Sequence, residues 1–216
     1  FGYDVVGYFN SQAEVDSAPA QEGAGVGRFR YRDVNGDGVI TPDDRTYLGD
    51  PVPDYSGGAT FTLNYKNLTL ETFWAWATGV DIFNHGKWWR DFFGTFEGSA
   101  KGVAALRSWT PELGNNAAAP IWESAANLST SGASNSWYVE SGDYVRLQRL
   151  ALLYNFDGNV LESLGVSKFE IGLAANNIWT ITDYSGLDPI VGGNADTNFG
   201  IDLGNYPVTP SYLFSV

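Results

Sequence analysis

The chain has 216 residues and carries 25 acidic against 12 basic side chains, a formal net charge of −13. This charge argues against binding to nucleic acid, which needs clustered Lys and Arg to neutralise phosphates. The absence of cysteine excludes disulfides, thiolate metal sites and a cysteine nucleophile.

Aromatic residues make up 15% of the chain, a surplus typical of large cores and of membrane-interface belts. No apolar run reaches the roughly 18 residues of a spanning helix, and the first residues lack the basic start of a secretory signal. Because the chain starts at Phe1 without Met and stops abruptly at Val216, we expect it to be a piece of a longer protein.

Period-two alternation, the pattern of a strand with two different faces, is the clearest local feature. A first strand is predicted over 59–65, and a tight turn at Lys66-Asn67 leads into a second, so the two form a hairpin. The second strand carries Leu68, Leu70, Trp74 and Trp76 on one face, and Thr69, Glu71 and Phe73 on the other.

Three further strands are predicted over 144–156, 169–179 and 208–216. In the first of these the alternation slips around Gln148-Arg149-Leu150, which suggests a β-bulge. The last carries Tyr212, Phe214 and Val216 on one face, and Ser211, Leu213 and Ser215 on the other.

The connections between these strands alternate between short and long. The short ones are Lys66-Asn67 and a moderate link over 157–168, and the long ones cover about 78–140 and 180–207. Short helical turns are predicted near 80–93 and 100–109. A membrane barrel has this alternation, with tight periplasmic turns and long extracellular loops. A soluble sheet with one wet face gives the same strand pattern; the loops and the aromatics at strand ends favour the barrel.

One segment, residues 33–44, has the spacing of a twelve-residue calcium loop. Gly38 stands at the sixth position, where the loop turns sharply. The alternative is an Asp/Asn/Gly-rich turn without an ion, and the Asp at position twelve and the extended flanks depart from the helix-flanked pattern. The predicted oxygen donors for a structural Ca²⁺ are Asp33, Asn35, Asp37, the carbonyl of Val39, and Asp44.

Other candidate sites are weak, and we predict that the chain is not an enzyme. His85 is the only histidine, so no catalytic triad or histidine-rich metal site can be built on it. Trp88-Trp89 and Phe92-Phe93 could stack on sugar rings, but the favoured interpretation is that they fold their own loop. The glycine-rich stretches lack the sequence context of a phosphate or dinucleotide loop.

Eight short blocks follow one another in a fixed order across essentially the whole chain. They are GYD at 2–4, YRDVNGDGVI at 31–40, DDR at 43–45, LGDPVPDY at 48–55, LNYKNL at 63–68, WYVESGDYVRL at 137–147, ANNIWTITDYSGLDP at 175–189 and GNYP at 204–207. In this order they resemble SusC/RagA-type TonB-dependent transporters.

The resemblance implies an all-β fold, an antiparallel transmembrane β-barrel segment that supplies about the last five strands of a barrel of about 22 strands. Residues 1–216 would be the C-terminal portion of this barrel, with the 33–44 segment outside the cell and the plug domain absent from the chain. The implied location is the outer membrane of a Gram-negative bacterium of the Bacteroidota type.

The resemblance also implies a function, TonB-energised uptake of glycan oligomers or peptides. The implied partners are a SusD-like surface lipoprotein, TonB through an N-terminal region outside this sequence, the remainder of the barrel and outer-membrane lipid. Two alternatives stay open, a soluble calcium-binding β-sandwich for adhesion or carbohydrate binding, and a β-rich glycoside hydrolase fragment with two opposed carboxylates.

Overall fold

The computed structural model describes the whole chain except residues 94, 96–97, 157, 159–164, 166–168 and 191–197. The chain forms two compact units. The sheet unit comprises Pro51–Asp81, Ser141–Ile190 and Asn205–Val216, and the loop unit comprises Phe1–Asp50, Ile82–Glu140 and the described part of 191–204. Within the described residues, no helix has the length and apolar character required to cross a membrane.

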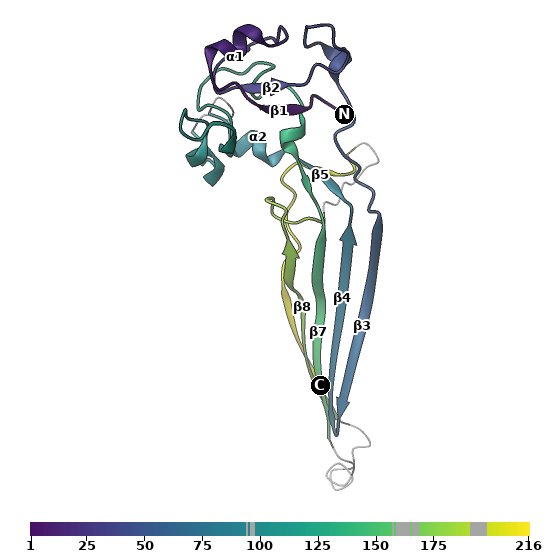
Figure 1. Cartoon of the computed structure of the whole chain (residues 1–216). Coiled ribbons are helices and arrows are strands. Elements are labelled where there is room, and N and C mark those ends of the chain that lie inside the picture. The colour runs from purple at the N-terminus through teal and green to yellow at the C-terminus, as the bar shows by residue number, and fades with distance from the viewer. Residues whose placement is uncertain (94, 96–97, 157, 159–164, 166–168, 191–197) are drawn as a thin grey trace. The chain divides into compact units, whose positions relative to one another are not determined.

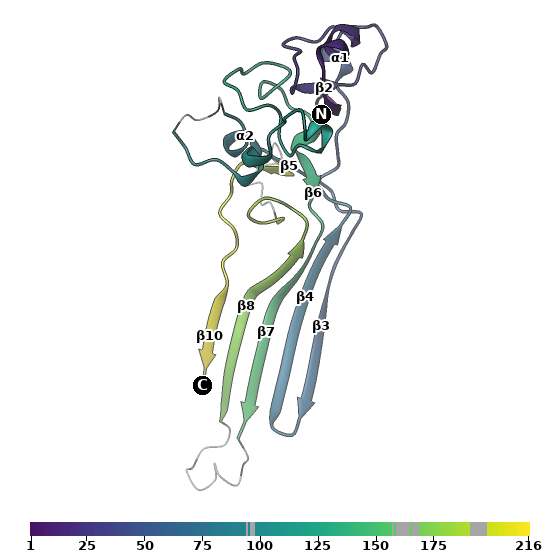
Figure 2. The ribbon, with the colours of Figure 1, turned by 60° about the vertical axis from the view of Figure 1, so that its left-hand side comes forward.

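The sheet unit is built on one antiparallel sheet of five strands in the order β10-β8-β7-β4-β3 (Figures 1 and 2). All five predicted strands are confirmed, although the last is shorter than predicted. Their bounds are β3 (Tyr55–Tyr65), β4 (Leu68–Thr78), β7 (Tyr144–Asn155), β8 (Glu170–Thr182) and β10 (Ser211–Ser215).

The predicted hairpin and bulge are both present. Tyr65 pairs directly with Leu68, so the turn has only two central residues, and Lys66 adopts a φ of 52° to make it. The β7 register shifts against both neighbouring strands around Gln148. Opposite it on β8, Asn177 has a φ of 53°, a conformation that Asn tolerates better than most residues. The predicted 157–168 link falls largely outside the described residues.

The loop unit consists of short elements joined by long-range pairing. Antiparallel β1 and β2 form one small sheet, and β6, β5 and β9 form another, in which β5 and β9 are parallel. The helical turns predicted near 80–93 and 100–109 correspond to α2 and η2, but none of these strands was predicted. The bounds are β1 (Val5–Tyr8), α1 (Gln12–Ser17), β2 (Phe29–Tyr31), η1 (Pro42–Asp44), β5 (Asp81–Asn84), α2 (Gly86–Arg90), η2 (Val103–Arg107), η3 (Gly114–Asn116), η4 (Ser136–Tyr138), β6 (Val139–Ser141) and β9 (Ile201–Asp202).

An aromatic core holds the loop unit together. Phe29 is fully buried at its centre, stacked on Tyr8 at 5.6 Å between ring centroids and in edge contact with Phe92. Trp88 packs against this core, so the prediction that these aromatics fold their own loop is confirmed for Trp88 and Phe92. The buried members are Tyr3, Tyr8, Phe29, Tyr31, Ile40, Phe92, Trp109 and Tyr138.

Candidate functional site

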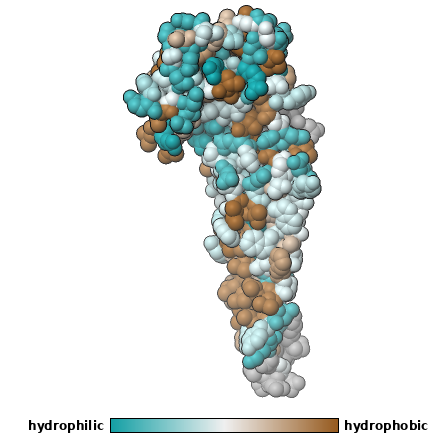
Figure 3. Space-filling view, viewed as in Figure 1, coloured by the Kyte–Doolittle hydropathy of each residue, from teal (hydrophilic) through white to brown (hydrophobic). Residues whose placement is uncertain are grey.

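One face of the five-stranded sheet is apolar from edge to edge. Strand pairing places five side chains in one continuous row across it. The end members stay exposed, Leu63 at 65% and Phe214 at 66%. Part of the apolar surface over the long strands is visible in Figure 3. The row, called the leucine row below, is Leu63, Leu70, Leu152, Leu173 and Phe214.

Aromatic side chains cluster toward both ends of this face. The ring of Trp74 meets that of Trp179 edge to face at 6.0 Å, because Leu147 of β7 pairs with both residues. Near the opposite strand ends, Tyr154 contacts Phe156 at 4.9 Å. Tyr and Trp at two levels around an apolar band match the interface girdles of membrane barrels.

The opposite face carries most of the polar side chains of the sheet, and several of them contact one another. Glu71 on β4 forms an ion pair with Arg149 on β7 at 3.5 Å. Asn176 on β8 donates to the hydroxyl of Ser211 on β10 at 3.1 Å. Near the start of β7 and beyond the end of β8, Arg146 forms a buried ion pair with Asp188 at 2.6 Å. The sheet can therefore separate an apolar medium from an aqueous one.

The 33–44 segment folds as a series of tight turns. The carboxylate of Asp33 accepts hydrogen bonds from the backbone N–H groups of Gly36 and Gly38, at 2.7 and 2.8 Å. Asp37 accepts from the N–H of Val39 at 2.9 Å. Gly38 has a φ of 82°, which L side chains rarely adopt, so the predicted role of this glycine in the turn is confirmed.

Asp44 ends the segment as a buried capping residue. Its side chain is fully buried and accepts from the N–H groups of Thr41 at 2.7 Å and Val34 at 2.8 Å. Burial alone would raise the pKa of the Asp44 carboxyl, but these hydrogen bonds outweigh it, with further help from Asn35 and Asp33, and hold the pKa below its ordinary value. The capping role of Asp44 was not predicted, although Thr41 three residues before an acid is the sequence signal for it.

These contacts bear on whether the segment fits a cation. The turns orient the first, third and fifth side chains within one short loop, and Ile40 anchors it in the aromatic core. The amide of Asn35, however, donates to Asp37 at 3.0 Å. Across the described part of the chain, no three acidic or histidine side chains gather closely enough to hold a metal ion. Calcium would therefore require the side-chain oxygens to draw closer together and the amide and carbonyl donors to contribute.

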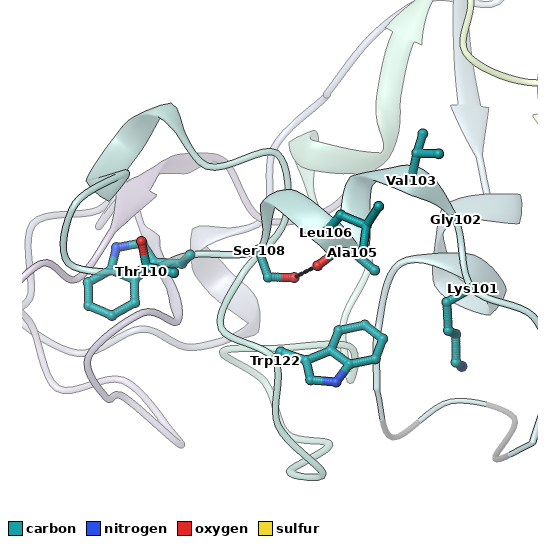
Figure 4. A pocket seen from close by; sticks show the side chains of 9 residues that line it. Lys101, Gly102, Val103, Ala105, Leu106, Ser108, Thr110 and Trp122 are labelled. Atoms are coloured by element: carbon teal, nitrogen blue, oxygen red, sulfur yellow. Dashed lines mark hydrogen bonds between the residues drawn. The ribbon is translucent and has the colours of Figure 1, made fainter.

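The loop unit also carries an apolar groove of about 560 Å³ (Figure 4). The indole of Trp122 lies beside Ala105 and Leu106 of η2, and Ser108 donates to the carbonyl of Ala105 at 2.8 Å. Val103 and Leu106 on the rim are 83% and 87% exposed, which is unusual for large aliphatic side chains. The groove is suited to an apolar group of another molecule, and no sequence pattern predicted it.

His85 is partly buried. Its ring stacks against those of Phe83 and Trp88, with centroids 6.2 and 5.8 Å away. Burial lowers the pKa of His85, so it stays neutral to lower pH than a free imidazole. Its packing is that of a structural aromatic residue.

The known proteins that resemble this chain in sequence are TonB-dependent receptors. No protein-family model matches the chain. TonB-dependent receptor P26 of Formosa agariphila is 32% identical to it over 211 residues, 95% of this chain and 21% of that receptor. TonB-dependent receptor P3 of the same organism is 29% identical over 215 residues, 96% of this chain and 20% of that receptor.

The chain belongs to the TonB-dependent receptors. It spans about a fifth of the length of the curated relatives that it matches. Those relatives are receptors rather than enzymes.

The fold of this TonB-dependent receptor chain agrees with the SusC/RagA resemblance. The structure of the RagAB peptide transporter matches 99% of the chain and 21% of its own length, with a TM-score of 0.74 at 19% identity. The RagAB peptide importer in its closed-closed state matches 99% of the chain and 22% of its own length, with a TM-score of 0.70 at 20% identity. The predicted β architecture is confirmed at this coarser level: the described chain is mostly β, and its five-stranded sheet is antiparallel.

The capping geometry of Asp44 predicts a pH-dependent stability. Because the folded-state pKa lies below the ordinary value of 3.8, the contribution of Asp44 is present above that pH and is lost as the pH falls through the folded pKa. Asp44→Asn should lower the free energy of unfolding at pH 7 by about 1–3 kcal/mol, the usual cost of weakening hydrogen bonds to a buried charge.

The test compares denaturant unfolding of the wild type and Asp44→Asn with a chelator present, so that bound calcium does not contribute. Asp43→Asn, at the exposed neighbouring carboxylate, is the control. The difference in free energy of unfolding between Asp44→Asn and the wild type should shrink as the pH drops below 3.8. A gap that stays constant with pH would refute the role of the ionised carboxylate.

Proposed function

We propose that this chain forms part of the wall and of the extracellular loops of an outer-membrane β-barrel, which imports nutrients with energy delivered through TonB. The leucine row carries this proposal, because it makes one face of a single-layered sheet apolar across five strands. Lipid accepts such a face, and closure of the sheet into a barrel satisfies its backbone hydrogen bonds.

In this proposal the chain supplies the last five strands of a barrel of about 22. The support is the five-stranded sheet itself and the fifth of the relatives' length that the chain spans. The remaining strands, a plug and the TonB-contacting region would come from parts of the protein beyond this sequence. The long strands have 11 to 13 residues, enough to cross a bilayer when tilted.

The proposed cargo is a glycan oligomer or a peptide, taken up together with a SusD-like surface lipoprotein. Support for the peptide option is that the RagAB structures are described as a peptide transporter and importer. The proposed binding surface for the lipoprotein includes Val103 and Leu106 on the rim of the groove, because exposed apolar patches mark protein contacts.

The soluble β-sandwich alternative is not favoured. A sandwich buries the apolar faces of two sheets against each other, whereas Leu63, Leu173 and Phe214 are exposed on this one. The relatives point to membrane receptors as well.

We further propose that the 33–44 segment binds a structural Ca²⁺ through Asp33, Asn35, Asp37, Asp44 and the carbonyl of Val39. The support is the donor spacing and the turn geometry of the loop. Extracellular calcium modules bind with dissociation constants of about 0.1–1 mM, which suits a loop facing the medium.

The wall proposal predicts opposite tolerances for two adjacent residues of β4. Leu70→Arg should destabilise the barrel in lipid by about 2–4 kcal/mol, since it puts a charge on the face that meets hydrocarbon. Glu71→Lys should be mild, because Glu71 lies on the polar face and only its exposed pair with Arg149 is lost.

The measurement is denaturant unfolding of the whole transporter reconstituted in lipid vesicles, with heat-modifiable migration as the check on folding. Similar losses of unfolding free energy for Leu70→Arg and Glu71→Lys would favour a water-soluble sheet over the barrel wall.

The calcium proposal predicts that added Ca²⁺ raises the melting temperature of the protein by several degrees. Asp37→Asn should abolish most of this rise, because it removes one of the ionised donors. Asp43→Asn is the matched control, since its carboxylate stands at position eleven and is not among the donors. Equal calcium responses in both variants would exclude the site, as would no response in the wild type.

The partner proposal predicts that Leu106→Asp reduces co-purification of the surface lipoprotein from outer membranes at least severalfold. A charge on the rim would lie against apolar surface of the partner without a counter-charge. Tyr47→Asp is the control, because Tyr47 is also 87% exposed but does not line the groove. Unchanged recovery with Leu106→Asp would place the lipoprotein elsewhere.

A further inference from the structure

We propose that Asp188 is a positioning residue that sets strand β10 on the edge of β8. Its carboxylate connects three parts of the chain that are far apart in the sequence. It binds the side chain of Arg146 on β7 at 2.6 Å, and it accepts from the backbone N–H of Ile190 at 2.9 Å. It also accepts from the N–H of Val208, twenty residues away, at 3.1 Å.

The ion pair gives this carboxylate a fixed position on the sheet. The side chains of Arg146 and Asp188 are only 5% and 9% exposed. The Nε of Arg146 donates to the hydroxyl of Thr180 on β8 at 2.8 Å, and its guanidinium lies over the ring of Tyr144 at 5.8 Å. Because the guanidinium is tied to both β7 and β8, the carboxylate that it holds cannot shift relative to those strands.

The segment that carries Asp188 is itself packed. Tyr184 and Pro189 are buried. A side chain at Gly186 would collide with the ring of Tyr184, so the backbone lies directly against that ring. Thr182 donates to the carbonyl of Asp143 at 2.7 Å, which secures the end of β8. Asp188 therefore lies in a well-packed turn, which fixes the position of its backbone.

The strand that this arrangement positions is short. β10 has five residues, and within the described chain it pairs only with β8. Val208, held by Asp188, precedes the first β10 residue, Ser211, by three positions. Ser211 pairs with Asn176, and a slip of one residue would turn Tyr212 and Phe214 to the polar face. A short edge strand has few hydrogen bonds of its own to prevent that slip.

An ordinary Asx turn would explain only the contact with Ile190, two residues on. The contacts with Val208 and Arg146 need a separate cause, and the burial of the ion pair makes them costly to break. We infer that the carboxylate fixes where the chain enters β10. The consequence of the Asp188 contacts for transport rests on the proposed barrel. In that barrel, the edge of β10 that faces away from β8 would pair with the next strand of the wall.

The test uses engineered disulfides in the full-length transporter, since this chain has no native cysteine. Ser211→Cys with Asn176→Cys reports the register of β10, because directly paired residues of antiparallel strands lie within disulfide range. Ala151→Cys with Ala174→Cys reports the β7–β8 pairing on the same face. Each pair is combined with Asp188→Ala, with Arg146→Ala, and with the control Asp183→Asn, an exposed acid in the same connection.

Asp188→Ala and Arg146→Ala should each abolish the 176–211 disulfide and leave the 151–174 disulfide intact, and Asp183→Asn should preserve both. Retention of the 176–211 disulfide in Asp188→Ala would overturn the proposal. Loss of both disulfides would overturn it too, because Asp188 would then support the whole sheet rather than position β10. These readouts report only strand pairing, so they do not depend on whether the membrane proposal survives the Leu70→Arg test.

Discussion

The sheet unit depends on one constraint, the shared register of five antiparallel strands. Register decides which side chains form a row, and rows decide whether each face is uniform. In the leucine row, four independent strand pairings must all hold for the apolar side chains to line up. A uniformly apolar face is favourable only in contact with another apolar phase. The register of the strands therefore decides in which medium the sheet can be stable.

The loop unit follows a different principle. Its stability comes from aromatic rings gathered from distant parts of the chain, with buried polar groups that fix their arrangement. Asn135 illustrates this, because it is fully buried, donates to the hydroxyl of Tyr31 at 3.0 Å, and accepts from the N–H of Trp137 at 3.1 Å. Segments that read as loops in the sequence thus form a scaffold that can hold the groove and the 33–44 segment in place.

The strands of the sheet unit were predictable because alternation is a local signal. Leu68 through Trp76 reveal their two faces within one strand, and the slip at Gln148 identified the bulge. The loop unit offered no such signal. β9 has two residues and pairs with Phe83 and Asn84, more than a hundred residues earlier, so nothing in its own sequence marks it as a strand. Long-range partners of this kind become visible only in three dimensions.

The same limit applied to the candidate sites. The donor spacing of the 33–44 segment was readable, because a turn is a local structure, and Gly38 takes the conformation expected of it. The contacts of Asp188 were not readable, since Arg146 and Val208 lie 42 and 20 residues away. The groove at Trp122 was equally hidden, because its walls come from segments that no pattern connects.

The bulge at Gln148 has a consequence for how such a sequence can change over time. On β7, Val145 and Leu147 share a face with Leu150 and Leu152, so the extra residue between them reverses the odd–even order of the strand. Loss of that single codon would move the apolar side chains of half of β7 to the polar face, whereas many substitutions there would leave the faces intact. Insertions and deletions in these strands should therefore persist only in compensating pairs, and the length of each strand should drift far more slowly than its composition.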